Sequence, residues 1–258
     1  MNKYKRLTIK VGTSTLTHKT GLLNYRSMEK LVQVVADLKN AGFEIVMVSS
    51  GSIGVGAGKL GFRSMPKDIP TKQACASIGQ SELMYVYDRL FGEYNHIISQ
   101  ILLTRYSVDK QEKRHNVCNT FNRLFEMGVI PIVNENDTVS TDELEFGDND
   151  TLSAIVAGMV QADLLIILTD IDGLYTDNPL ENKMAKRIPL VHKIDDAVRK
   201  AAQGKGSAFG TGGMITKIDA AQIAAQKGIE TAILDGKKPQ DMYKLLNGEE
   251  VGTRFLLD

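Results

Sequence analysis

The feature that most constrains the fold is a set of short apolar runs that are not interrupted by polar residues. The clearest are Glu44–Ser49, Val129–Asn134 and Leu164-Leu165-Ile166-Ile167-Leu168. A strand with one wet face alternates apolar and polar residues, whereas a continuous apolar run is typical of a parallel strand covered by helices on both faces. These runs therefore predict a buried, mainly parallel sheet.

Segments with helical periodicity separate these runs. Ser27–Asn40 is the clearest, because its apolar residues recur at spacings of three and four. Further helices are predicted at Ile69–Tyr94 (one or two), Asn116–Met127, Asp150–Val160, Asp195–Ala202 and Met214–Lys227, and further strands at Leu7–Val11, Ile97–Leu103 and Glu230–Leu234. Repeated strand–helix units predict an α/β fold, a three-layer α/β/α sandwich around a mainly parallel sheet. We expect one domain over residues 1–258, with lobes of about 1–160 and about 161–258.

Composition excludes several classes of protein. The formal net charge is +0, and Lys and Arg are spread along the chain, so we expect no nucleic-acid partner. No segment has the length and apolarity of a membrane span, and the N-terminus lacks the apolar core of a signal peptide. Cys75 and Cys118 have no paired spacing that would indicate a disulfide framework or a zinc site. We therefore expect a cytoplasmic protein with no membrane partner.

Two glycine-rich turns near the two ends of the chain are suited to binding an anion. The first follows the strand Leu7–Val11, which carries Lys10 into Gly12-Thr13-Ser14. The second is Gly210-Thr211-Gly212-Gly213, directly before a predicted helix that carries Lys217. Glycines let backbone N–H groups approach a phosphate, and a helix N-terminus adds free N–H groups and the positive end of its dipole. We expect the two turns to hold one polyphosphate from both sides.

Polar residues also follow other predicted strands at the points where these strands end. Ser50-Gly51 follows one strand, Asn134-Glu135-Asn136-Asp137 closes another, and Thr169-Asp170 follows a third. Ligands of open α/β sheets bind beyond the carboxyl ends of the strands, so these residues are predicted to share one site.

The run Gly54–Gly61 does not fit either common glycine fingerprint. A P-loop needs Ser or Thr after its lysine, but Leu60 follows Lys59, and a dinucleotide fingerprint would begin too far from the strand that ends at Ser49. We instead predict that Ser50-Gly51-Ser52 forms a carboxylate-binding turn at a helix N-terminus, and that the later glycines allow close helix packing.

Taken in order along the chain, these motifs, together with Gly147-Asp148-Asn149-Asp150, resemble the amino-acid kinase family and its carbamate kinase-like fold. The resemblance covers nearly the whole chain. It implies a member that uses ATP and Mg²⁺ to phosphorylate the side-chain carboxylate of L-glutamate, giving L-glutamyl 5-phosphate, the first step of proline biosynthesis. It further implies a homo-oligomer (dimer or tetramer) inhibited by proline. Longer members carry a C-terminal RNA-binding-type (PUA) module, which we expect this chain, ending at Asp258, to lack.

The resemblance also implies a role for each site residue. Lys10 and Lys217 would flank the γ-phosphate and Asp150 would orient both lysines, with Mg²⁺ held through the ATP phosphates and no metal ligand from the protein. The ATP-binding set is Lys10, Gly12, Thr13, Thr169, Asp170, Tyr175, Thr211, Gly212, Gly213, Met214 and Lys217. The substrate-binding set is Ser50, Gly51, Asn134, Asp137 and Asn149, with Asp137 suited to the ammonium group.

The chemistry is consistent with this reading. A glutamate carboxylate, with a pKa of about 4.3, is already an ionised nucleophile at neutral pH, so no general base is needed. The barrier is repulsion between two anions, which positioned lysines would lower. Alternatives are a kinase of the same fold for N-acetylglutamate, aspartate, carbamate or a nucleoside monophosphate, a non-catalytic amino-acid sensor, and a nicotinamide dehydrogenase. An acetylated amine would not call for Asp137, and a sensor would be expected to have lost Lys10 or Lys217.

Overall fold

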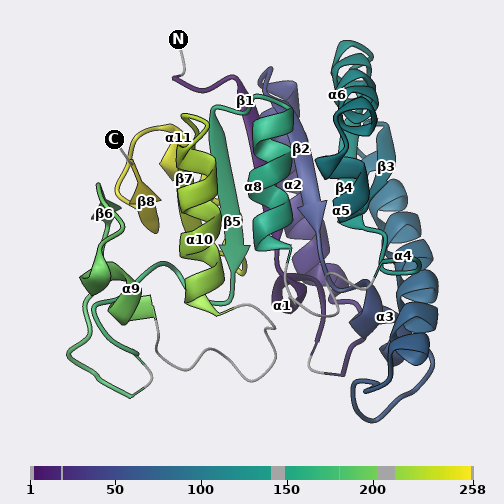
Figure 1. The fold of residues 1–258 in the computed structure, drawn as a ribbon, viewed down its shortest axis with the longest axis horizontal. Helices are drawn as coiled ribbons and strands as arrows, with labels where there is room; N and C mark the ends of the chain where they lie inside the picture. The colour runs from purple at the N-terminus through teal and green to yellow at the C-terminus, as the bar shows by residue number, and fades with distance from the viewer. Residues whose placement is uncertain (1–2, 19, 141–148, 180, 203–212, 257–258) are drawn as a thin grey trace.

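The computed structural model describes residues 3–18, 20–140, 149–179, 181–202 and 213–256. Eight described strands form one sheet in the order β3-β4-β2-β1-β5-β7-β8-β6 (Figure 1). They are β1 (Arg6–Val11), β2 (Glu44–Ser49), β3 (Ile98–Leu103), β4 (Ile130–Glu135), β5 (Leu164–Thr169), β6 (Leu190–Val191), β7 (Glu230–Asp235) and β8 (Thr253–Phe255). Among these strands only β7 and β8 pair antiparallel, which confirms the mainly parallel sheet.

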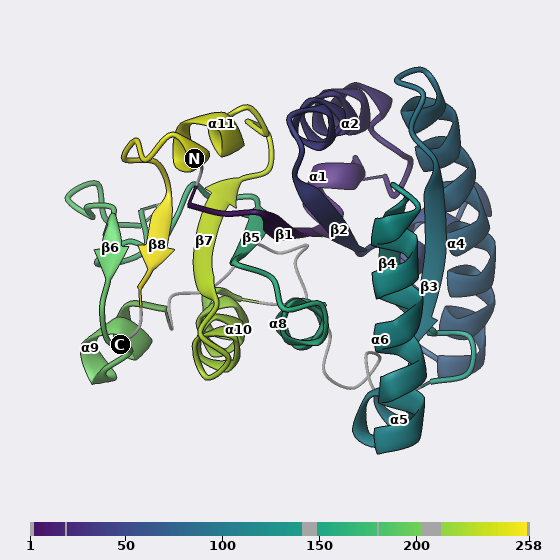
Figure 2. The same cartoon turned by 90° about the horizontal axis from the view of Figure 1, so that it is seen from above.

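Helices cover both faces of the sheet (Figure 2). On one face lie α1 (Thr13–Leu16), α2 (Tyr25–Asn40) and α11 (Asp241–Leu246), and on the other lie α6 (Gln111–Glu126), α8 (Asp150–Met159) and α10 (Met214–Ala225). The remaining described helices are α3 (Ser52–Lys59), α4 (Ile69–Gly92), α5 (Arg105–Asp109) and α9 (Asp196–Ala202). This arrangement confirms the predicted three-layer α/β/α sandwich. None of the described helices has the length and apolarity needed to cross a membrane.

The alternation of side chains along β1 directs one charged residue into the interior. Leu7, Ile9 and Val11 belong to the core beneath α2 and α11. Thr8 and Lys10 point to the opposite face, and both are buried although neither is apolar. The apolar core on that face is built from α6, α8 and α10. The position of Lys10 within the strand therefore directs its side chain toward the helices α8 and α10.

Most predicted elements are found within one or two residues of their predicted ends, and Ile69–Gly92 is a single helix. The prediction for Asn116–Met127 was wrong at its start, because α6 begins at Gln111 and its first turns are exposed and polar. The short elements α1, α5, α11 and β6 were not predicted, since each is too short to show a period. Near the C-terminus, β8 pairs antiparallel with β7 and parallel with β6.

The prediction of close helix packing in the glycine run is confirmed. A Cβ atom on Gly56 would lie 1.9 Å from the carbonyl oxygen of Cys75, and one on Gly79 would lie 1.8 Å from that of Ser52. The backbones of α3 and α4 therefore touch at both positions, and neither position leaves space for a side chain. This contact brings α4 against the start of α3, beside the carboxyl end of β2.

Candidate active site

Two buried lysines meet one carboxylate where β1 ends and α8 and α10 begin. Lys10 Nζ lies 2.8 Å from Asp150 Oδ1, and Lys217 Nζ lies 3.0 Å from Asp150 Oδ2. The side chains of the three residues are at most 5% exposed. Thr216 adds a hydrogen bond from its hydroxyl to Asp150 Oδ2 at 2.8 Å. Residues from β1, α8 and α10 thus converge on one point.

The electrostatics of this cluster favour an anionic ligand. Burial alone would raise the pKa of Asp150, but the charges of Lys10 and Lys217 and the hydrogen bond from Thr216 together hold that pKa well below its usual range. Asp150 is therefore ionised at neutral pH. Two ammonium groups therefore lie within 3.0 Å of one buried carboxylate. Lysine ammonium groups gathered in one place favour the binding of an anion such as a phosphate group.

Backbone groups beside the lysines are also suited to binding an anion. Gly12 follows β1 directly and is the N-cap of α1; its N–H donates to the Leu168 carbonyl oxygen at 3.1 Å, and a Cβ atom there would lie 3.9 Å from Lys10 Nζ. Gly213 is the N-cap of α10 and, as a glycine, has no side chain to cap that helix. The start of α10 consequently offers N–H groups to an anion next to Lys217. The predicted residues Thr211 and Gly212, like Gly147 and Asp148, lie outside the described residues.

The turn after β2 forms a second part of the site. Gly51 has φ 92°, a left-handed conformation that favours glycine, and it is the N-cap of α3. The predicted turn at a helix N-terminus is therefore present. Ser52, the first residue of α3, donates a hydrogen bond from its hydroxyl to Asp137 Oδ2 at 2.8 Å. This contact brings the end of β4 toward the start of α3.

A chain of amides runs beside this turn. Asn149 precedes α8, but its side chain does not cap that helix. It instead donates from Nδ2 to the Ser49 carbonyl oxygen at 2.7 Å and to Asn134 Oδ1 at 2.6 Å. Asn134 in turn donates from Nδ2 to Gln80 Oε1 at 2.8 Å. The sequence indicated Asn134 and Asn149, but nothing in it pointed to Gln80 or to a contact between Ser52 and Asp137.

Around the turn after β2 and the end of β4, three buried side-chain atoms have no hydrogen-bond partner among the described residues. They are Ser50 Oγ, Asp137 Oδ1 and Asn149 Oδ1. Buried polar atoms in folded proteins are nearly always paired, so a group of unpaired ones indicates the position of a polar ligand. The set contains one hydroxyl donor and two acceptors, one of which belongs to a carboxylate.

The remaining predicted residues lie along the carboxyl end of β5 and after it. Thr169 is buried as the last residue of β5, and its hydroxyl lies 3.2 Å from Asp170 Oδ1. Tyr175 donates to Asp172 Oδ1 at 2.8 Å, and burial together with this contact raises the pKa of Tyr175. Met214 is the first residue of α10 and is half-buried. In the described part of the chain, no group of three or more His, Cys, Asp or Glu residues is placed to hold a metal ion.

Comparison with known proteins identifies the family of this chain. The profile of the amino acid kinase family matches residues 5–235. The chain belongs to the amino acid kinase family. It is 49% identical over 256 residues to glutamate 5-kinase from Clostridium perfringens and 50% identical to that from Clostridium acetobutylicum, covering 95% and 96% of these proteins. It is also 48% identical to glutamate 5-kinase from Carboxydothermus hydrogenoformans, of which it covers 68%.

Solved structures share the fold at much lower identity. Carbamate kinase from Giardia lamblia matches with a TM-score of 0.66 at 16% identity over the full length of both chains. UMP kinase from Bacillus anthracis matches with a TM-score of 0.65 at 17% identity, over 98% of this chain and 96% of that chain. These matches show that the fold of the family tolerates nearly complete change of sequence, so they support the fold and not the substrate.

Proposed function

We propose that this protein transfers the γ-phosphate of ATP to the side-chain carboxylate of L-glutamate, as the name of its relatives describes. The observation that carries the proposal is the group of unpaired atoms Ser50 Oγ, Asp137 Oδ1 and Asn149 Oδ1. Asn149 directly precedes Asp150, which binds both lysines, and its hydrogen bond to the Ser49 carbonyl oxygen links it to the residue before Ser50. A polar amino-acid site thus adjoins a cationic phosphate site.

The unpaired atoms match the groups of an amino acid. The carboxylate Asp137 Oδ1 and the amide Asn149 Oδ1 are acceptors for an ammonium group, and Ser50, with the Gly51 amide, is a donor for a carboxylate. Asn134 holds Asn149 in place. An N-acetylated substrate has no ammonium and would leave the buried charge of Asp137 unmatched, so the free amino acid is the better fit.

Lys10 and Lys217 are suited to the phosphates of ATP, with Thr13 and Gly213 supplying backbone N–H groups and Gly12, which has no side chain, leaving room beside Lys10. Thr169, Asp170, Tyr175 and Met214 are the residues we assign to the nucleotide, together with Thr211 and Gly212. In this division, residues 1–160 carry most of the amino-acid side and residues 161–258 most of the nucleotide side. Mg²⁺ bound to the ATP phosphates would neutralise part of their charge.

No general base is needed, because the substrate carboxylate is already ionised at neutral pH. The lysines lower the repulsion between this carboxylate and the phosphate, and they stabilise the charge that shifts toward the leaving group in the transition state. Asp150 keeps both ammonium groups within 3.0 Å of one carboxylate, so the two positive charges are positioned before the substrates bind. The rate enhancement therefore comes from positioned charge.

The proposal can be tested with one assay. ATP consumption is measured with L-glutamate, with N-acetylglutamate, with L-aspartate and with buffer alone, and hydroxylamine is added to trap an acyl phosphate. We expect turnover and hydroxamate formation with L-glutamate only. Equal or greater turnover with N-acetylglutamate or aspartate would overturn the substrate assignment, and no turnover with any of them would overturn the activity.

We further propose that proline inhibits the enzyme by competing for Asp137, Asn134 and Asn149, since it has the same α-carboxylate and ammonium groups. Inhibition by proline should disappear at saturating glutamate, and full activity at saturating proline with little glutamate would contradict this. We also propose a cytoplasmic homo-oligomer that does not bind nucleic acid. Light scattering tests the oligomer, and an unchanged mobility of RNA at low salt tests the last point.

A further inference from the structure

The side-chain amides of Asn134 and Asn149 are hydrogen-bonded to each other. Among the described residues of α4, only Gln80 forms a hydrogen bond with this pair. Its Oε1 accepts the Nδ2 proton of Asn134 at 2.8 Å. Asn134 is 1% exposed, so its amide cannot turn to water instead. The close contact of Gly79 with the backbone of Ser52 brings this part of α4 within reach of the site.

Two backbone groups define which way the amides face. The Glu135 N–H donates to Asn134 Oδ1 at 2.9 Å, so Asn134 must direct its oxygen there and its Nδ2 toward Gln80. The Ser49 carbonyl accepts from Asn149 Nδ2 at 2.7 Å, so Asn149 must direct its nitrogen away from the unpaired position. Asn149 Oδ1, an acceptor, therefore remains for the ligand.

We infer that Gln80 is a positioning residue that holds Asn134, and through it Asn149, so that an acceptor faces the ammonium group of the amino-acid substrate. The inference rests on the proposed function and extends it to a residue that does not itself touch the substrate. Without the Gln80 acceptor, the buried Nδ2 of Asn134 would lack its partner. The Asn134 amide could then adopt other orientations, in which its hydrogen bond to Asn149 is lost. The cost should fall on recognition of the ammonium and not on phosphate transfer.

The test compares Gln80→Met, which removes the acceptor, with Gln80→Glu, which keeps an oxygen at the same place. Gln73→Met is the matched control, because Gln73 lies two turns earlier on α4 and is also half-buried. Binding is measured for L-glutamate and for glutarate, which has both carboxylates but no ammonium. The kcat and the KM for ATP are measured for each variant.

For Gln80→Met we expect glutamate binding to weaken by roughly 5- to 150-fold, as for one buried donor left unpaired. Glutarate binding, the KM for ATP and kcat at saturating glutamate should stay within about threefold, and Gln80→Glu should restore most of the glutamate affinity. Equal weakening for glutamate and glutarate, or a Gln80→Glu variant as weak as Gln80→Met, would overturn the inference. A parent protein that neither binds nor phosphorylates glutamate would instead refute the proposed function.

Discussion

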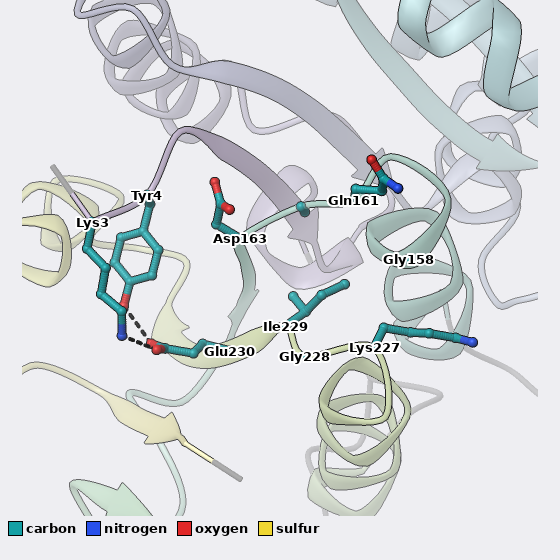
Figure 3. A pocket seen from close by; sticks show the side chains of 10 residues that line it. Lys3, Tyr4, Gly158, Gln161, Asp163, Lys227, Gly228, Ile229 and Glu230 are labelled. Carbon is teal, nitrogen blue, oxygen red and sulfur yellow. Dashed lines mark hydrogen bonds and ion pairs between the residues drawn. The ribbon is translucent and has the colours of Figure 1, made fainter. Parts of the chain in front are cut away.

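The two edges of the sheet both carry clustered charges, but they treat these charges differently. At the carboxyl ends of the strands, Lys10, Asp150 and Lys217 are almost fully buried and three nearby polar atoms have no partner among the described residues. At the amino ends, Glu230 is partly exposed and is paired with Lys3 and Tyr4 (Figure 3), and also with Arg254. The side chain of Lys3 is 63% exposed.

The amino-end edge also has a hollow, with a volume of about 570 Å³. Its lining comes from the start of the chain and from the ends of α8 and α10: Lys3, Tyr4, Gly158, Gln161, Ala162, Asp163, Lys227, Gly228, Ile229 and Glu230 (Figure 3). Asp163 in that lining accepts hydrogen bonds from the backbone of Lys5 and Arg6. The carboxylates of Asp163 and Glu230, which line this hollow, therefore already have partners within the protein. A cavity alone does not identify a binding site. The buried charges of Lys10, Asp150 and Lys217 at the carboxyl ends of the strands are the better indication.

The largest expected contrast is between Asp150→Asn and Glu230→Gln. Asp150→Asn removes the carboxylate that both buried lysines contact, so we expect the free energy of unfolding to fall by about 3–5 kcal/mol. Turnover should fall by roughly a hundredfold to a thousandfold. Glu230→Gln should change stability by less than about 1 kcal/mol, as for partly exposed pairs, and leave turnover unchanged. Urea unfolding and steady-state assays measure both, and equal effects at the two edges would refute the contrast.

Two lysines near opposite ends of α10 provide the next comparison. Lys217→Met should lower kcat by roughly a hundredfold to a thousandfold while the KM for glutamate stays within about threefold, because the lost interaction is strongest in the transition state. Lys227→Met, at the exposed end after α10, should behave like the parent enzyme. Initial rates over a full range of glutamate concentrations separate the two parameters. A kcat for Lys217→Met within a few-fold of the parent would remove Lys217 from the chemical step.

Carboxylates at the two edges should differ in what they bind. Asp137→Asn should raise the KM for glutamate by the equivalent of about 2–5 kcal/mol and leave the KM for ATP nearly unchanged, because it removes the charge that meets the ammonium. Asp163→Asn should instead lower stability by about 1–3 kcal/mol, through weakened contacts to two backbone N–H groups, and leave both KM values unchanged. Equal effects of Asp137→Asn on both substrates would mean that Asp137 is structural.

The smallest effect concerns pH. Burial alone would raise the pKa of Glu230, but contacts with Lys3, Tyr4 and Arg254 lower it below its ordinary value of 4.5. A lowered pKa in the folded state gives stability that is present above pH 4.5 and is lost as the pH falls through the folded value. The stability difference between the parent and Glu230→Gln, under about 1 kcal/mol, should therefore be seen at pH 7 and vanish in acid. A stability difference between the two proteins that grows as the pH falls would contradict this prediction.

Much of the fold could be predicted because its signals are local. The continuous apolar runs of β2, β4 and β5 and the period of α2 each lie within one short segment. The position of Lys10 between Ile9 and Val11 already assigns it to one face of the sheet. The polar residues that end each strand could be assigned to one edge, because parallel strands bring their carboxyl ends together.

The sequence by itself determined the layers, the edge of the sheet that holds the candidate site and the residue types that lie there. Only the tertiary structure decided that Gln80 contacts Asn134, that Ser52 contacts Asp137, and which polar atoms stay unpaired. These contacts join residues 54 and 85 positions apart. The period of a strand or helix sets the direction of a side chain within that one element. Contacts between elements also depend on how closely the two elements pack, as α3 and α4 do at Gly79. The local sequence of one element does not encode its distance from another.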